Sequence, residues 1–163
     1  MSLDFRVGIG YDVHRFAEGR RLVLGGVVVP FERGLLGHSD ADVATHALME
    51  ALLGAAGLGD IGQHFPPDDP TYKDISSLVL LDRVGQVLAG RGWQIVNVDV
   101  SIIAQYPRLA DHLPAMRQEI GRVLSLEEPR VSLKATTSDQ LGFTGRGEGI
   151  AACAVALLEG AKR

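Results

Sequence analysis

The amino-acid sequence predicts an α/β protein of the α+β type, built on one mixed β-sheet with helices packed mainly on one face. Two observations lead to this prediction. Segments with the two-residue periodicity of strands alternate along the chain with segments of helical periodicity. The 163 residues, of which 46% are hydrophobic and 22% charged, suit one domain with a substantial core. We therefore assign residues 1–163 to a single domain.

Strand and helix signals follow one another in the first third of the chain. In the segment FRVGIGYDVH, residues 5–14, apolar residues alternate with glycine and polar residues, which predicts a buried, glycine-punctuated strand. Residues 21–30 are expected to form a second strand or hairpin arm around a glycine pair. Residues 39–57 then carry apolar side chains at helical spacing and predict a helix capped by Ser39 or Asp40.

The rest of the chain continues the same alternation after one long loop. The stretch 57–77 is rich in glycine, proline and aspartate, and a loop of that length is usually functional or disordered. After it we expect, in order, a helix at 77–90, a strand at 93–105, a helix at 113–124, and strands at 130–137 and 149–159 that flank a polar loop.

Charge and cysteine content narrow the class of function. The formal net charge of −4 argues against a nucleic-acid surface, which needs a concentrated basic face. Cys153 is the single cysteine, so the chain forms no internal disulfide and no cysteine-based zinc cluster, which suits a reducing cytoplasm. We see neither an apolar run of about 18 residues nor the pattern of a signal peptide. We expect a cytoplasmic protein that does not act on a membrane.

Asp12 and His14 are the first candidate ligands of a metal ion. Residues i and i+2 of a strand point to the same side, about 6.6 Å apart, which lets both side chains approach one ion. His46, inside the predicted helix, is the best candidate for a third ligand. One aspartate and two histidines would leave the fourth tetrahedral position of zinc open, as in catalytic sites. The alternative is that all three are ordinary hydrogen-bonded polar residues.

The segment KATTSDQLGFTGRGEG, residues 134–149, is the second candidate site. It offers Lys134, consecutive hydroxyl groups at positions 136–138, Asp139, Arg146 and several glycines. Hydroxyl groups and exposed backbone N–H groups bind phosphate oxygens, and glycine lets a ligand approach the backbone closely. The segment matches neither GxxxxGK[ST] nor GxGxxG. A phosphate site and a plain glycine-rich hairpin loop both remain open on these residues.

Other polar residues near the candidate ligands have simpler interpretations. Asp42 and Glu50 each lie four residues from His46, so either carboxylate is placed to orient the imidazole, unless both belong to a solvated helix face. His64 and His112 have no such partners, and we expect ordinary polar residues there, with His64 making a loop contact. A deaminase is excluded, because its signature needs a CxxC pair.

Long segments in order along the chain resemble the motifs of one enzyme family. They are GYDVHRF, GLLGHSDADVATHALMEALLGAAGLGDIGQHFP, NVDVSIIAQYPR and KATTSDQLGFTGRGEGIA. The family is that of the 2-C-methyl-D-erythritol 2,4-cyclodiphosphate synthases of the non-mevalonate isoprenoid pathway. The resemblance is specific, because several long segments agree and together cover nearly the whole chain.

The resemblance implies two kinds of metal ion. Asp12, His14 and His46 would hold one zinc ion per subunit, and Asp139 would hold Mg²⁺ or Mn²⁺ through the phosphates of the substrate. These assignments agree with ligand chemistry, since imidazole suits zinc whereas carboxylate and phosphate oxygens suit magnesium or manganese. The family usually has glutamate at the position of Asp139, so the carboxylate here is one methylene shorter.

The resemblance also implies catalytic and substrate contacts. His38 and Thr137 would stabilise the transition state. The implied substrate contacts are Asp12, Val13, His14, His38, Ser39, Asp60, Ile61, Gly62, Phe65, Pro66, Pro67, Asp68, Asp69, Ala104, Gln105, Tyr106, Pro107, Arg108, Leu109, Ala110, Thr136, Thr137, Ser138, Asp139, Phe143 and Arg146. Two of them depart from the family pattern, since Pro67 stands where aspartate is common and Arg108 where lysine is common.

Each region of this set would receive one part of the substrate. Residues 60–69 would line a methylerythritol pocket, residues 104–110 would receive the cytidine, and residues 136–139 would contact the diphosphate. The implied substrate is 4-diphosphocytidyl-2-C-methyl-D-erythritol 2-phosphate. An oxygen of its 2-phosphate would attack the β-phosphorus and release CMP, so that no protein nucleophile is required.

The resemblance implies a homotrimer with active sites between neighbouring subunits. It also implies a central cavity near Phe143 and Arg146 that accepts an isoprenoid diphosphate. Two other functions fit the residues. One is a zinc phosphoester hydrolase, for which Glu50 is the only nearby base. The other is a non-catalytic trimeric module that binds isoprenoid phosphates without a metal.

Overall fold

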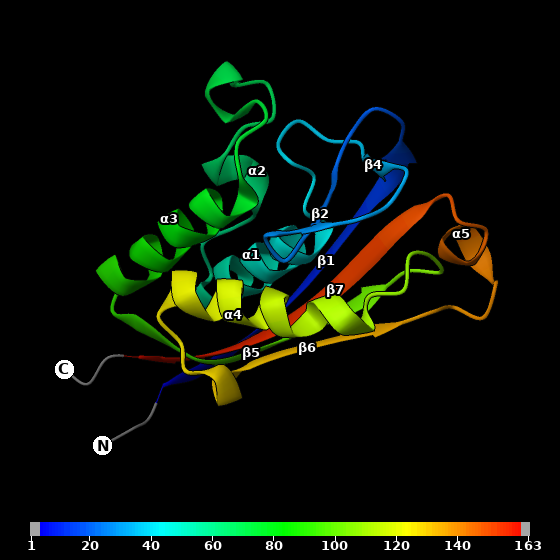
Figure 1. Ribbon diagram of the computed structural model, residues 1–163. Coiled ribbons are helices and arrows are strands. Elements are labelled where there is room, and N and C mark those ends of the chain that lie inside the picture. The colour runs from blue at the N-terminus through cyan, green and yellow to red at the C-terminus, as the bar shows by residue number, and fades with distance from the viewer. Residues whose placement is uncertain (1–3, 161–163) are drawn as a thin grey trace.

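The β-sheet runs through the whole length of the molecule and is mixed, as the sequence predicts (Figure 1). A computed structural model describes residues 4–160. The five strands lie in the order β4 (Gly34–Leu35), β1 (Phe5–Ala17), β7 (Gly149–Gly160), β5 (Trp93–Ile103) and β6 (Val131–Thr136). β5 and β6 are parallel, whereas the other neighbours are antiparallel. The two terminal strands of the chain, β1 and β7, therefore pair in the middle of the sheet.

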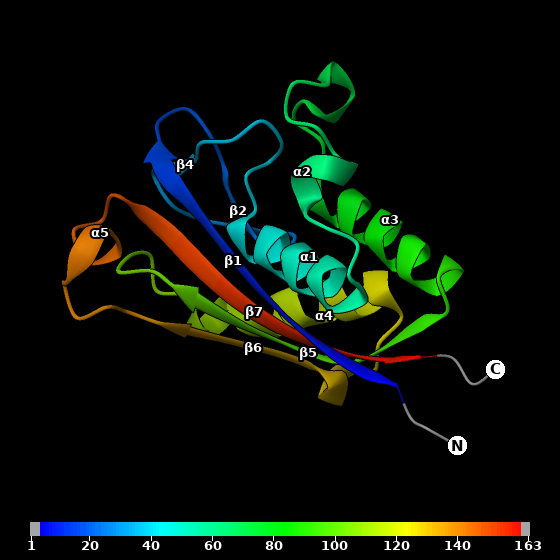
Figure 2. The same cartoon turned by 180° about the vertical axis from the view of Figure 1, so that it is seen from behind.

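The long helices all cover the same face of the sheet, which confirms the prediction of one helical layer (Figures 1 and 2). They are α1 (Val43–Ala56), α3 (Ser77–Gly90) and α4 (Leu113–Leu124), the last two with the predicted bounds. Leu48, Leu81 and Met116, one from each helix, are fully buried between this layer and the sheet. None of the helices of the described chain is long and apolar enough to cross a membrane.

The segments between these elements contain more structure than the sequence predicts. The glycine-rich segment 21–30 is a hairpin of β2 (Leu22–Leu24) and β3 (Val27–Val29). The long loop holds α2 (Ile61–His64) and a 3₁₀ turn, and the polar loop holds α5 (Gly142–Gly145). The 3₁₀ turns are η1 (Pro70–Tyr72), η2 (Ala110–His112) and η3 (Glu128–Arg130).

Glycines on β1 allow α1 to lie directly against the sheet. A Cβ atom added at Gly10 would stand 1.9 Å from the carbonyl oxygen of Ala47, and one added at Gly8 would stand 2.0 Å from that of Ala51. Both obstacles are backbone atoms of α1, so any larger residue on this face of β1 would hold the helix away. Because Asp12 and His14 share this face of the strand by its two-residue period, they too point toward α1.

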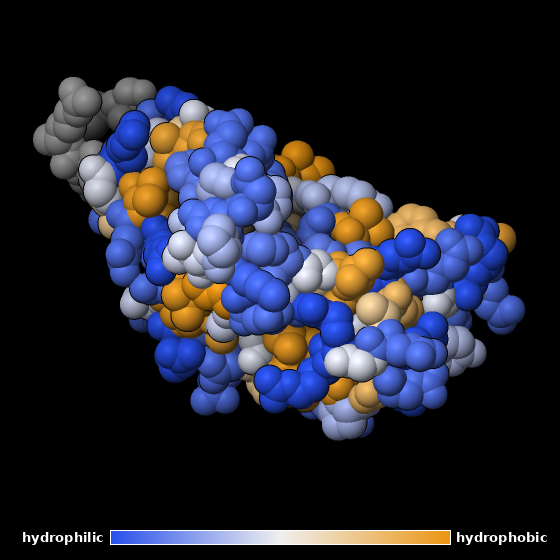
Figure 3. Space-filling view, turned by 90° about the horizontal axis from the view of Figure 1, so that it is seen from above, coloured by the Kyte–Doolittle hydropathy of each residue, from blue (hydrophilic) through white to orange (hydrophobic). Residues whose placement is uncertain are grey.

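The opposite face of β1 is open, so the prediction of a buried strand holds only for its glycine face in the single chain. The apolar side chains that alternate with the glycines, Phe5, Val7, Ile9, Tyr11 and Val13, are 43% to 71% exposed. The reason is that all three long helices lie on the glycine side. Seen from above in Figure 3, the helical side has only scattered hydrophobic patches among hydrophilic side chains. The exposed apolar side chains of β1 form a stripe on the sheet face that the helices leave uncovered.

The start of α1 differs from the prediction. Its N-cap is Asp42, whose carboxylate accepts a hydrogen bond from the backbone N–H of Thr45, whereas Ser39 or Asp40 had the favoured residue types. The same carboxylate also accepts from the backbone N–H groups of Gly25 and Gly26. Asp42 thus joins the helix to the β2–β3 hairpin. Ser39 and Asp40 do not cap the helix, and their side chains make other contacts near His46.

Candidate metal centre and active site

Asp12, His14 and His46 bring three ligand atoms together between β1 and α1. The Asp12 carboxylate oxygen lies 2.9 Å from His14 Nε2 and 3.2 Å from His46 Nδ1. The two histidine nitrogens are 3.2 Å apart. The sequence predicts this meeting of strand and helix, and the structure shows that the three groups can hold a metal ion.

The spacing of the three atoms fits a tetrahedral metal. Ligands about 2.0–2.1 Å from zinc at tetrahedral angles are separated from one another by about 3.3 Å. The observed separations of 2.9 to 3.2 Å are slightly shorter. Two imidazole nitrogens and one carboxylate oxygen are also a donor set that suits zinc, and three protein ligands leave one position for an oxygen of another molecule.

The imidazole of His14 is held by the backbone. Its Nδ1 lies 2.7 Å from the carbonyl oxygen of Leu36, which only accepts hydrogen bonds, so Nδ1 carries the proton. Nε2 is therefore the nitrogen that releases its proton to bind a metal, on the side that faces Asp12 and His46. A contact of this kind fixes both the tautomer and the orientation of a metal-ligating histidine.

The charges of the three groups support one another. Burial works to raise the pKa of Asp12, but hydrogen bonds and positive charge from His14 and His46 outweigh it and hold that pKa far below its usual range. Burial conversely works to lower the pKa of His14, and the hydrogen bond and negative charge of Asp12 raise it on balance. The aspartate is thus ionised at neutral pH and stabilises positive charge between the three groups.

A pocket of about 280 Å³ opens beside the three ligand atoms. Predicted site residues in its lining are His14, His38, Ser39, His46, Ile61, Gly62, Phe65 and Pro67. His38 Nε2 donates to the backbone carbonyl of Asp69 at 3.0 Å, and this hydrogen bond joins the segment that precedes α1 to the long loop. Asp60 caps α2 through the N–H of Gln63, and Asp68 is exposed. The structure therefore gathers four of the eight residues predicted for the methylerythritol pocket around the metal ligands.

A second pocket, of about 300 Å³, holds the predicted cytidine group. Its lining includes Ala104, Gln105, Pro107, Arg108, Leu109, Ala110, Thr136 and Thr137. Tyr106, by contrast, is 63% exposed and lies outside this lining. Gln105 connects the two loops that form the pocket, because its side-chain oxygen accepts from the N–H of Gln140. Among the described residues, the linings of the two pockets have no member in common.

The loop after β6 uses part of its polar groups to hold itself together. The hydroxyl of Ser138 donates to the carbonyl of Leu141 and lies 2.7 Å from the hydroxyl of Thr144, so its bonding capacity is largely occupied within the loop. Asp139, in contrast, is exposed, and its backbone has a positive φ of 52°. Thr137 Oγ1 accepts from the Asp139 N–H at 3.3 Å. The chain therefore offers Asp139 to solvent, two residues after Thr137 in the lining of the second pocket.

Phe143 and Arg146 lie at a third place. Phe143 lines a pocket of about 510 Å³ at the end of β1, together with Val13 and His14, and His14 also borders the 280 Å³ pocket. Arg146 forms an ion pair with Glu148 at 2.6 Å, and both side chains are more than half exposed. The positive charge of Arg146 is thus already partly balanced within its own chain.

The predicted partners of His46 are wrong. Asp42 is fully buried as the cap of α1, and Glu50 accepts the backbone N–H of Ile61 at 3.0 Å, so neither touches the imidazole. His46 Nε2 instead lies 2.9 Å from Ser77 Oγ and 3.1 Å from Ser39 Oγ. Ser77 begins α3, and nothing in the sequence links that position to the helix 39–57 before the fold is known.

His64 behaves as the sequence predicts. Its Nε2 donates to the carbonyl oxygen of Leu58 at 2.9 Å, which is a contact within its own loop.

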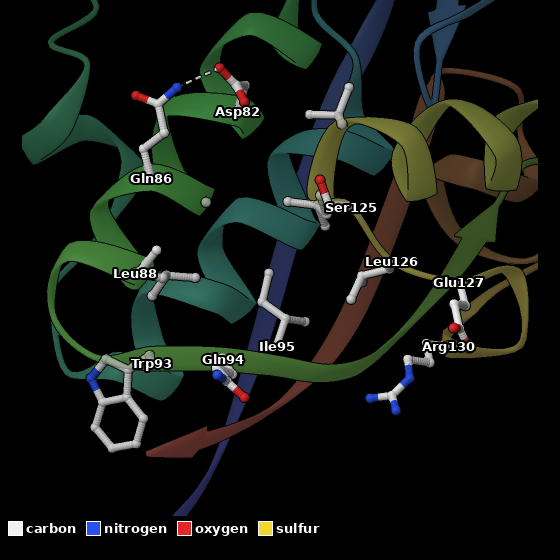
Figure 4. A pocket seen from close by; sticks show the side chains of 14 residues that line it. Asp82, Gln86, Leu88, Trp93, Gln94, Ile95, Ser125, Leu126, Glu127 and Arg130 are labelled. Carbon is white, nitrogen blue, oxygen red and sulfur yellow. Dashed lines mark hydrogen bonds between the residues drawn. The ribbon is translucent and has the colours of Figure 1, made fainter. Parts of the chain in front are cut away.

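A larger hollow of about 560 Å³ lies between α3, β5 and the end of α4 (Figure 4). Figure 4 shows Asp82 hydrogen-bonded to Gln86 on α3, while Glu127 and Arg130 lie across the hollow. Its carboxylates therefore do not converge on one point, and its lining contains none of the predicted site residues. The candidate active site is the group of residues around His46.

Comparison with known proteins identifies the family. A model of the YgbB family matches residues 5–159. The chain belongs to the YgbB family. One relative in this family, the 2-C-methyl-D-erythritol 2,4-cyclodiphosphate synthase of Syntrophomonas wolfei, is 62% identical over 154 residues, which are 94% of this chain and 98% of the relative. The family inferred from the sequence motifs is thereby confirmed.

Solved structures of YgbB-type proteins have the same fold. The IspF of Plasmodium falciparum, in a complex with CDP, is 31% identical, with a TM-score of 0.85, and the match covers 99% of this chain and 100% of that one. The bifunctional IspDF of Campylobacter jejuni is 42% identical with a TM-score of 0.94. That match covers 98% of this chain but only 43% of the bifunctional protein.

Proposed function

We propose that the chain converts 4-diphosphocytidyl-2-C-methyl-D-erythritol 2-phosphate to 2-C-methyl-D-erythritol 2,4-cyclodiphosphate and CMP, as a phosphorus–oxygen lyase. The observation that carries the proposal is the group of three ligand atoms, 2.9 to 3.2 Å apart, at the edge of a pocket that His38 and Ser39 line. Membership of the cyclodiphosphate synthase family supplies the reaction class.

The protein groups position a substrate that reacts with itself. His38 and Ser39 stand next to the metal ligands, where an imidazole and a hydroxyl can hold phosphate oxygens. Phe65 and Pro67 give the pocket an apolar side for the methylerythritol carbon chain. Both reacting groups are phosphates, already ionised near neutral pH, so the protein needs neither a nucleophile nor a general base. Its main contribution is orientation, and well-oriented intramolecular reactions have effective molarities of about 10⁵ M or more.

Asp12, His14 and His46 would hold zinc. When bound there, the ion supplies Lewis-acid stabilisation of negative charge on phosphate oxygens. Thr136 and Thr137 contribute hydroxyls at the second pocket, and Asp139 is exposed to take Mg²⁺ or Mn²⁺ together with the diphosphate. The alternative of a zinc hydrolase relied on Glu50 as its base, and this carboxylate accepts the N–H of Ile61.

The complete active site would need a second copy of the chain. The metal ligands and the predicted cytidine residues line separate pockets, so one substrate must reach residues of both. The apolar stripe of β1 offers a face on which copies can associate, since a continuous row of exposed apolar side chains, with Ile9 at 71%, marks an interaction surface. These features support self-association, and the family resemblance implies that the assembly is a homotrimer with active sites between subunits.

The same assembly would enclose Phe143 and Arg146 from each subunit. An apolar ring and a cation three residues apart in the chain suit an isoprenoid diphosphate, with the tail against Phe143 and the phosphates on Arg146. Because a ligand that binds only the folded state stabilises it, saturating geranyl diphosphate should raise the melting temperature of the trimer. An Arg146→Ala variant should lose that increase, and an unchanged melting temperature of the wild type would refute this site.

Phosphorus NMR of the substrate tests the reaction directly. With zinc and magnesium present, the purified protein should give cyclic-diphosphate resonances together with CMP, and a chelator should abolish both. The His46→Ala variant should retain its fold but lose zinc and product, whereas the control His64→Ala should retain both. An unchanged spectrum with folded, zinc-loaded protein would refute the proposed reaction, and zinc retained in His46→Ala would refute the metal site.

A further inference from the structure

The side of His46 that faces away from Asp12 and His14 contacts a buried polar network. Its Nε2 lies 2.9 Å from the hydroxyl of Ser77, the first residue of α3, which is fully buried. The carboxylate of Asp40 in turn accepts from the backbone N–H of Ser77 at 2.9 Å and from its hydroxyl. A chain of contacts thus runs from Asp40 through Ser77 to the imidazole.

The Asp40 carboxylate, at one end of this series of contacts, determines the direction of each hydrogen bond in the series. Asp40 also accepts the backbone N–H of Asp42, so its oxygens act as acceptors for three donors. The single proton of the Ser77 hydroxyl is therefore committed to Asp40, and Ser77 Oγ presents a lone pair to His46. That lone pair requires a proton on Nε2. When the imidazole is neutral, its lone pair is then on Nδ1, on the side where Asp12 and His14 lie.

Ser39 does not replace Ser77 in this role. Its hydroxyl oxygen is farther from Nε2, at 3.1 Å, and already accepts the backbone N–H of Ala41. It also lines the 280 Å³ pocket, where it is available to a ligand. Ser77 has no such freedom, because Asp40 holds both its backbone and its hydroxyl.

We propose that Ser77 and Asp40 are positioning residues that fix the tautomer and the ring orientation of His46 for metal binding. The proposal rests on the metal site of the proposed function and extends it to residues that touch neither metal nor substrate. On the other ligand, the carbonyl of Leu36 performs the same task for His14. Groups of this kind typically change metal affinity by about 10–100-fold when they are removed.

Zinc affinity, measured by competition with a chromogenic chelator, tests the proposal without any catalytic assay. The Ser77→Ala variant should bind zinc about 10–100-fold more weakly than the wild type. Asp40→Asn should weaken zinc in the same range, and the double variant should lose little more than either one, because the two residues act in series. Ser76→Ala is the matched control, since it removes the neighbouring hydroxyl that only caps α3, and it should bind zinc as the wild type does.

Spectroscopy separates a positioning role from a general loss of structure. In the zinc form, nitrogen NMR should show a slowly exchanging proton on His46 Nε2, and Ser77→Ala should speed its exchange. The visible bands of the Co²⁺ form should change in Ser77→Ala and remain unchanged in Ser76→Ala. Wild-type zinc affinity in Ser77→Ala would overturn the proposal while the metal site stands. A wild-type protein that binds no metal would overturn the site itself.

Discussion

Replacement of Gly10 by alanine tests the idea that the metal site depends on how closely α1 approaches β1. The added methyl group would stand 1.9 Å from the carbonyl oxygen of Ala47 and 2.6 Å from the backbone nitrogen of Ala51. Ordinary contact begins near 3.4 Å, so the shortfall is about 3.4 − 1.9 = 1.5 Å. Since both obstacles are backbone atoms in the middle of a helix, no side-chain rotation relieves the clash, and α1 must move away from the strand.

The expected effect follows from which atoms move. Overpacking of a well-packed interior typically costs about 1–3 kcal/mol, and a displacement of a whole helix puts Gly10→Ala at or above the upper end. His46 directly precedes Ala47, so it moves with the helix, whereas Asp12 and His14 stay on the strand. The three ligand atoms are 2.9 to 3.2 Å apart. A shift of His46 by about 1.5 Å is larger than the ligand distances of a tetrahedral zinc site can tolerate. Folded Gly10→Ala protein should therefore bind zinc poorly.

The assay combines urea unfolding with zinc content after dialysis. Gly54→Ala is the matched control, because it adds the same methyl group within α1 itself, where the nearest atom, the Ile9 carbonyl oxygen, is 3.9 Å away. It should keep zinc and gain up to about 1 kcal/mol from helix propensity. If Gly10→Ala kept both the wild-type stability and a full complement of zinc, the close approach of strand and helix would not be what forms the site.

Three further predictions concern charge, capping and assembly. Because Asp12 raises the pKa of His14, zinc must displace a proton from that imidazole. Zinc affinity measured by chelator competition should therefore rise with pH through the neutral range, and a flat profile would contradict this. Asp42→Ala removes a helix cap and leaves two backbone N–H groups of the hairpin without their acceptor. In urea unfolding, the free energy of unfolding should therefore fall by about 3 kcal/mol or more, and a fall below about 1 kcal/mol would count against the role of Asp42. Ile9→Asp should convert trimers to monomers in light scattering and abolish cyclisation while zinc remains bound, since its ligands come from one chain. Persistent trimers in that variant would exclude β1 as the interface.

Periodicity was sufficient to predict the elements that carry the metal ligands. The two-residue alternation of β1 places Asp12 and His14 on one side, and the helical spacing around His46 places it on the inner face of α1. The same alternation does not say which side the helices cover. The glycines at positions 8 and 10 were the available clue, because a face without side chains is the one that a helix can approach most closely.

The surroundings of His46 were beyond prediction from local pattern. The carboxylates four residues from His46 were the natural candidates for a hydrogen bond to its imidazole. Glu50 instead accepts the N–H of Ile61, and Asp42 accepts the N–H of Thr45 as the cap of α1. The group that does contact the imidazole, Ser77, is 31 residues away and reaches it only because α3 begins beside α1. Cap choice shows the same limit, since Asp40 and Asp42 have the same side chain and tertiary contacts decide between their roles.

The two aspartates in the segment SDAD explain why the metal site and the core of this protein are linked. Asp42 turns inward and ties α1 to the β2–β3 hairpin, which fixes where the helix begins. Asp40 turns to α3 and fixes Ser77, the hydroxyl that faces His46. One helix start therefore sets both the position of the histidine along the strand and the orientation of its ring. A substitution at either aspartate should therefore weaken metal binding. Loss of Asp42 would displace α1, and loss of Asp40 would let the imidazole of His46 rotate.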